Sequence, residues 1–155
     1  IKSSVYSKMG VAVYPVIVIQ FFTSLIGSPL GEEIGWRGFA LNNLYSKIGQ
    51  IPAGIIVGSL WWLWHIALFM ALGVPVNMYS YLQMLGFSFL IDYLFISSEY
   101  NILVAMFAHQ SITTKFTFFD GKTNEPAGLI VLWGILLVVL IFRVIAGREN
   151  RTIRE

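Results

Sequence analysis

Two adjacent carboxylates and an arginine lie inside an otherwise apolar part of the chain. Glu32 and Glu33 are followed by Arg37 in the segment GEEIGWRG. Charged side chains in an apolar membrane segment are expensive and commonly functional. In a helix, residues four apart share a face, so Glu33 and Arg37 are predicted to pair, while Glu32 points roughly 100° away, over Trp36. This spacing neutralises Glu33 and leaves the carboxylate of Glu32 available for chemistry. The alternative is a solvated helix start at the membrane surface, with Pro29 in its first turn.

The chain has two histidines, His65 and His109, and both lie in apolar segments. A turn is expected near Gly49, 17 residues after Glu32 and 16 before His65. Two helical arms of that length lift both side chains roughly 24–26 Å from the turn, and His109 falls within about two helical turns of that depth. One membrane histidine is often a hydrogen-bonded packing residue, but two at the depth of a free glutamate favour a site.

The residue types in this set suit the activation of water. The segment around His109 adds Thr113, four residues later and on the same helix face. No serine is paired with a base in an obvious motif, and the absence of cysteine excludes thiolate catalysis, disulfides and Cys-type zinc sites. We expect Glu32 to take a proton from water that His65 positions, and His109 with Thr113 to donate to the oxyanion of an attacked carbonyl. The predicted reaction is peptide-bond hydrolysis.

A zinc ion is the alternative for the same side chains. Glu32, His65 and His109 are ordinary zinc ligand types, and the metal would activate its bound water. The chain contains no HExxH pattern, so the sequence allows zinc without requiring it.

The composition indicates an all-α polytopic membrane protein. Apolar side chains make up 57% of the chain and charged ones 12%, about half the share in soluble domains. The apolar runs predict about five spans, near residues 10–29, 52–72, 79–97, 101–118 and 127–146. The net charge of +2 is too small to suggest nucleic acid, so the expected partners are the lipid bilayer and a peptide or protein substrate. Because residue 1 is isoleucine, we expect residues 1–155 to be one membrane domain of a longer chain.

Three local features bear on how these spans pack. Gly27-Ser28-Pro29 interrupts the first apolar run, as a kink or as a break between two helices. Gly54 and Gly58 form a small-residue face suited to close helix contact. Asp92, near the end of its span, is interpreted as an interfacial group rather than a ligand.

Three motifs in this order resemble the CAAX prenyl protease and bacteriocin-processing (CPBP, or Abi) family of intramembrane endopeptidases. That family carries EExxxR on one helix, an aromatic residue four before a histidine on the next, and HxxxN on a later one. Residues 32–37 read EEIGWR, residues 61–65 read WWLWH and residues 109–113 read HQSIT. The resemblance covers about residues 25–115, and Thr113 replaces the usual asparagine.

The resemblance implies an intramembrane protease in a bacterial cytoplasmic membrane. It makes Glu32 the base, with Glu33 and Arg37 in support and His65 and His109 completing the site. Both a metalloprotease and a metal-free glutamate mechanism are associated with the family, so zinc stays open. The resemblance allows prenylated C-terminal peptides, peptide leaders, pheromones or membrane-anchored regulators as substrates, and no feature of the sequence selects among them.

Two readings from other classes compete with a protease. The first is a non-catalytic membrane scaffold or bacteriocin-immunity-type protein with the same fold. The second is a small transporter with a Glu/His proton relay, which predicts inverted repeats that the sequence lacks. Dependence of substrate cleavage on Glu32 separates the protease from both.

Overall fold

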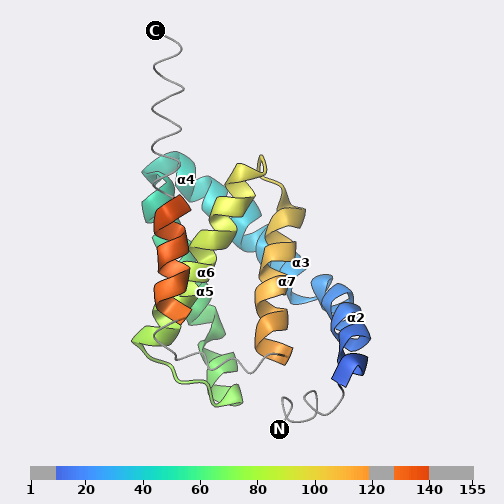
Figure 1. Cartoon of the computed structure of the whole chain (residues 1–155). Helices are drawn as coiled ribbons and strands as arrows, with labels where there is room; N and C mark the ends of the chain where they lie inside the picture. The colour runs from blue at the N-terminus through green and yellow to red at the C-terminus, as the bar shows by residue number, and fades with distance from the viewer. Residues whose placement is uncertain (1–9, 119–127, 140–155) are drawn as a thin grey trace.

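The computed structural model describes residues 10–118 and 128–139, and within these ranges the chain is helical with no strand (Figure 1). This confirms the all-α class. The elements are η1 (Gly10–Ala12), α2 (Val13–Leu25), α3 (Ser28–Glu33), the π-helix η2 (Ile34–Leu41), α4 (Asn42–Ile48), α5 (Gln50–Leu72), α6 (Met78–Ser97) and α7 (Ile102–Phe118). A further helix covers Gly128–Val139.

Helices α5 and α6 are each long and apolar enough to cross a membrane. A third crossing is obtained if Gly10–Leu25 and Ser28–Ile48, bent by 40° at their junction, count as one span. Helix α7 has 17 residues, and the helix Gly128–Val139 is also short for a crossing. The expected number of about five spans is therefore approximate, although each expected segment is largely helical where the structure describes it. The last expected span continues beyond the described residues.

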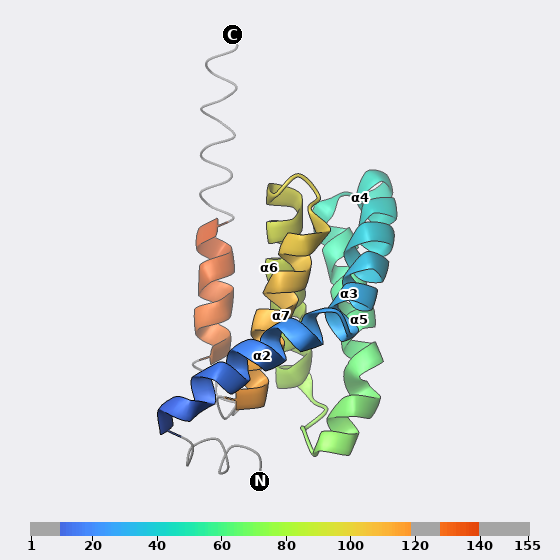
Figure 2. The ribbon, with the colours of Figure 1, turned by 90° about the vertical axis from the view of Figure 1, so that its right-hand side faces the viewer.

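The interruption at Gly27-Ser28-Pro29 separates two helices. Helix α2 ends at Leu25 and α3 begins at Ser28, with Pro29 in the first turn, where its missing N–H leaves no helical hydrogen bond unmade. Figure 2 shows that the segment from α3 to α4 lies beside α5. Helix α2 is inclined to this segment. The break therefore sets the direction in which the acidic motif at the end of α3 enters the bundle.

A tight turn at Gly49 folds α4 back onto α5. Gly49 has φ of +82°, a backbone conformation that favours glycine. The antiparallel arrangement that follows brings the end of α3 to the level of Trp61 in α5, where Glu32 and Trp61 form a hydrogen bond. The turn thus places the acidic motif beside the segment that carries His65, as the chain spacing predicted.

Helices α5 and α6 approach each other along the predicted glycine face. A Cβ on Gly54 would lie 2.6 Å from Phe89 Cε1, and one on Gly58 would lie 2.8 Å from Leu85 Cδ1. The same positions would lie 3.2 Å from Asp92 Oδ2 and 3.1 Å from Ser88 Cβ, respectively. The glycines therefore allow α6 to bring two polar side chains deep into the bundle.

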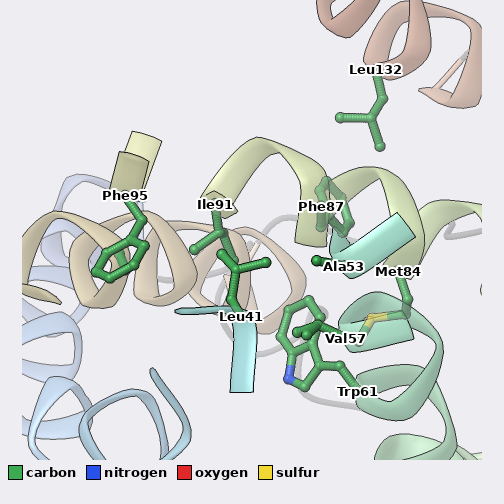
Figure 3. Packing of buried hydrophobic residues seen from close by; sticks show 10 residues of the cluster. Leu41, Ala53, Val57, Trp61, Met84, Phe87, Ile91, Phe95 and Leu132 are labelled. Atoms are coloured by element: carbon green, nitrogen blue, oxygen red, sulfur yellow. The ribbon is translucent and has the colours of Figure 1, made fainter. Parts of the chain in front are cut away.

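An apolar core surrounds this contact and joins η2, α5 and α6. In Figure 3, Leu41, Val57, Trp61 and Ile91 lie close together at its centre. Helix α7 adds buried Ala105 to the same cluster and packs against α2, α3 and α6. The polar side chains described next lie among these apolar groups.

Candidate active site

The predicted ion pair between Glu33 and Arg37 is confirmed. Arg37 Nη1 lies 3.0 Å from Glu33 Oε1, and both side chains have 0% of their surface exposed. The backbone from Ile34 onward is a π-helix rather than the expected α-helix, yet the two side chains still meet. Short π segments occur frequently at functional sites.

Arg37 also binds α6 through Asp92 and Ser88. Its Nε donates to Asp92 Oδ1 at 2.9 Å, and its Nη2 donates to Ser88 Oγ at 2.9 Å and to the Ser88 carbonyl at 3.3 Å. The guanidinium carbon lies 5.0 Å from the Trp61 ring centroid. Asp92 is 2% exposed, so its interpretation as an interfacial group is wrong. Close packing against Gly54 carries this carboxylate inward, where Arg37 compensates its charge.

His109 binds the same oxygen of Glu33. Its Nδ1 lies 2.7 Å from Glu33 Oε1, and its side chain is almost fully buried. Because the Arg37-paired carboxylate is an acceptor, His109 Nδ1 carries a proton and donates. This bond fixes the orientation of the ring and leaves Nε2 as the nitrogen that can bind another group. The structure therefore pairs His109 with Glu33, whereas the sequence analysis grouped it with Glu32.

Glu32 lies at the wall of an open cavity. Trp61 Nε1 donates to its Oε2 at 2.8 Å, and the Ser28 hydroxyl donates to its Oε1. The cavity has a volume of about 700 Å³. Glycines and aromatic residues form most of its wall, which consists of Gly27, Ser28, Gly31, Glu32, Gly35, Trp36, Phe39, Ala40 and Trp64. Glu32 is the charged residue in this wall, so its carboxylate can meet a molecule that enters the cavity.

Trp61 connects Glu32 with both histidines. Its ring centroid lies 5.2 Å from that of His65 and 5.1 Å from that of His109, both in edge-to-face geometry. His65 Nδ1 donates to the Trp61 carbonyl at 2.8 Å, which leaves His65 Nε2 as an acceptor. Within the described residues, no hydrogen bond joins Glu32 to either imidazole. The structure thus brings the three side chains together around one indole rather than in direct contact.

Thr113 lies on an exposed part of α7. Its hydroxyl donates to the His109 carbonyl at 3.2 Å, one helical turn before it. In this rotamer the hydroxyl proton is used within the helix, so donation to a bound group requires the side chain to rotate. His109 and Thr113 are neighbours as predicted, but their hydrogen-bonding groups have different partners.

Sequence reasoning missed the roles of Asp92 and Ser88. A usable signal was their spacing: they lie four apart on α6, just as Gly54 and Gly58 lie four apart on α5. A second signal was that Arg37 alone could compensate only one of the carboxylates that the apolar segments contain. Both signals bear on where Asp92 and Ser88 could lie, but neither names Arg37 as their partner.

The residues proposed as zinc ligands do not form a metal site in this arrangement. Both histidines donate from Nδ1 to an oxygen, as metal-bound histidines often do. However, the described part of the chain holds no group of three His, Asp or Glu side chains arranged to bind a metal ion. We therefore assign no step to a metal.

Comparisons with known proteins agree with the motifs. A model of the family "Type II CAAX prenyl endopeptidase Rce1-like" matches residues 14–114, which include all three motifs. CAAX prenyl protease 2 of Methanococcus maripaludis is 28% identical over 102 residues, which make up 66% of this chain and 27% of the relative. The chain thus spans about a quarter of the length of that curated relative. No solved structure matches this chain. With its apolar membrane helices and a family match over more than half of its length, the chain is an integral membrane protein that belongs to the Rce1-like family of type II CAAX prenyl endopeptidases.

Proposed function

We propose that this chain is the core of an intramembrane endopeptidase in which Glu32 activates water to hydrolyse a peptide bond. The observation that carries the proposal is the position of Glu32 at the cavity wall, fixed by an indole that also contacts both histidine rings. Membership of a family of endopeptidases supports the same reaction.

In this proposal Glu32 is the general base. Each carboxylate oxygen accepts more than one hydrogen bond, so the contacts from Trp61 and Ser28 leave room for water to donate. The oxygen of that water forms a bond to the substrate carbonyl carbon while its proton moves to Glu32. The C–N bond then breaks, and Glu32 returns the proton to the leaving amine. His65 Nε2 accepts a hydrogen bond from the other hydrogen of the water, which stays on the oxygen, and so orients the water.

His109 stabilises the oxyanion in this proposal. Glu33, Asp92 and Arg37 together carry one net negative charge when ionised, and a doubly protonated His109 makes the group neutral. Such an imidazolium donates from Nδ1 to Glu33 and can donate from Nε2 to the oxyanion. Thr113 becomes a second donor when its hydroxyl leaves the His109 carbonyl.

The proposed substrate is a peptide or protein with an apolar portion. Trp36, Phe39 and Trp64 line the cavity beside Glu32, and their rings suit a prenyl group or a membrane-anchored segment better than a charged peptide. Location in a bacterial cytoplasmic membrane is proposed from the motif resemblance.

Cleavage of quenched fluorescent peptides in liposomes tests the proposal. The peptide set contains prenylated and unprenylated sequences, and the variants are Glu32→Gln and the matched control Glu99→Gln. Glu99 is an exposed carboxylate at the turn between α6 and α7, outside the site. We expect Glu32→Gln to lower kcat by about 10²–10⁴-fold and Glu99→Gln to leave it unchanged. Equal cleavage by wild type and Glu32→Gln would contradict the proposal, and no cleavage by wild type across the set would favour the scaffold alternative.

A further inference from the structure

We infer that Asp92, together with Ser88, is a positioning residue for the candidate active site. From α6 it fixes the guanidinium of Arg37, which in turn holds Glu33 against His109. The link to catalysis rests on the proposed function, whereas the link to the position of His109 does not.

The three donor nitrogens of Arg37 point to three different partners. Nε points to Asp92, Nη1 to Glu33 and Nη2 to Ser88, so three sides of one planar group are engaged at 2.9–3.0 Å. A planar guanidinium with three fixed contacts cannot rotate without breaking at least one of them. Asp92 and Ser88 supply two of these contacts from a helix that carries none of the predicted site residues.

Among the described residues, Glu33 accepts hydrogen bonds through only one of its two carboxylate oxygens. Glu33 Oε1 receives both Arg37 Nη1 and His109 Nδ1, while Oε2 is buried and has no partner among the described residues. Arginine and carboxylate groups frequently pair through two parallel hydrogen bonds instead. Here the bonds to Asp92 and Ser88 turn the guanidinium away from that geometry. Without them, Arg37 can swing to bind both oxygens of Glu33.

Such a movement of Arg37 would loosen the position of His109. Its Nδ1 shares Oε1 with Arg37, so a guanidinium that binds both oxygens weakens the Glu33–His109 bond and frees the ring to rotate. Loss of Asp92 also removes one of the two carboxylates that pair with Arg37. The charged and titratable groups near the ring are Glu33 in direct contact, Arg37 and Asp92 behind it, and Glu32 and His65 across Trp61.

Nitrogen-15 NMR of labelled histidines in nanodiscs tests the inference without requiring activity. The chain has two histidines, so a His65→Gln sample assigns both sets of ring signals. We compare Asp92→Asn and Ser88→Ala with Tyr81→Phe, which removes a different polar contact between α5 and α6, from Tyr81 to Ser59. The expected result is that Asp92→Asn moves the ring signals of His109 but not of His65, that Ser88→Ala moves them less, and that Tyr81→Phe moves neither. Unchanged His109 signals in both α6 site variants would overturn the inference.

Helix content and the unfolding midpoint show whether each variant is folded. If Asp92→Asn does not fold, Ser88→Ala replaces it in the test. A parallel cleavage assay separates the inference from the proposed function. We expect Asp92→Asn to lower kcat about 10–100-fold with little change in KM, as for other residues that orient a catalytic side chain. If His109 moves but the wild type cleaves no peptide, the positioning role holds and the proposed function fails. If the wild type cleaves and Asp92→Asn cleaves equally well with His109 unmoved, the positioning role fails and the proposed function holds.

Discussion

Glu32 and Glu33 are neighbours in the chain but lie in opposite environments. Glu33 is fully buried and binds Arg37 and His109, which come from η2 and α7. Glu32 lies at a cavity wall and is held by two neutral donors, the Trp61 indole and the Ser28 hydroxyl. A carboxylate paired with a guanidinium inside the protein serves the structure, whereas one bound by neutral groups beside a cavity can exchange a proton. If Glu32 is the base, as proposed, this difference divides the motif into a structural half and a chemical half.

Removing the central cation should have the largest effect on the structural half. Arg37→Leu leaves the buried carboxylates of Glu33 and Asp92 without their cation. We expect a loss of about 3–5 kcal/mol of folding free energy. Unfolding in mixed detergent measures it, with Lys47→Met, an exposed cation of α4, as the control. A loss below about 1 kcal/mol would mean that the buried network contributes little to stability.

Forcing α5 and α6 apart should lower the folding free energy by less than the loss of Arg37 does. Gly54→Ala places a methyl carbon 2.6 Å from Phe89 Cε1 and 3.2 Å from Asp92 Oδ2. We expect a loss of about 1–3 kcal/mol, because helix α6 must shift to admit it. Gly134→Ala is the control, since an added carbon there has nothing within 4 Å. Equal unfolding midpoints for the two variants would argue against a close α5–α6 contact.

A substitution at Trp61 tests the link between the two halves. Trp61→Phe keeps an aromatic ring beside both histidines but removes the N–H that binds Glu32. We expect kcat to fall about 10–100-fold while stability falls by about 1 kcal/mol. Trp62→Phe is the matched control, because it removes an indole N–H that binds Ser80 instead. Equal kcat losses in the two variants would show that the bond to Glu32 has no special role.

The smallest effect is expected at Thr113. Thr113→Val retains the shape of the side chain and removes its hydroxyl, which now donates to the His109 carbonyl. Because the hydroxyl must rotate before it can serve an oxyanion, we expect kcat to fall by only about tenfold, below the usual loss for such a donor. Steady-state cleavage kinetics measure this, and a loss above about 10³-fold would make Thr113 a principal donor.

Local spacing made part of this site predictable. The ion pair of Glu33 and Arg37 follows from residues four apart, and the Gly49 turn fixed the level at which Glu32 meets Trp61. Gly54 and Gly58 correctly indicated a close helix contact. These features depend on short stretches of chain, where helix geometry alone decides which side chains meet.

Long-range partners were not predictable in the same way. Asp92 lies 55 residues from Arg37, and His109 lies 76 residues from Glu33. Which carboxylate His109 binds depends on helix tilt and rotation, which a hydropathy pattern does not encode. The π-helix also went unpredicted, because the same residues fit an ordinary helix equally well.

Glu32→Gln and Glu33→Gln, compared in one experiment, test whether the two adjacent carboxylates have different roles. Peptide cleavage and the unfolding midpoint are measured for both variants in the same liposomes and detergent. We expect Glu32→Gln to lose cleavage and keep the wild-type midpoint, and Glu33→Gln to unfold more easily because Arg37 and His109 lose their shared anion. Wild-type cleavage by Glu32→Gln, or a larger loss of stability in Glu32→Gln than in Glu33→Gln, would contradict this expectation.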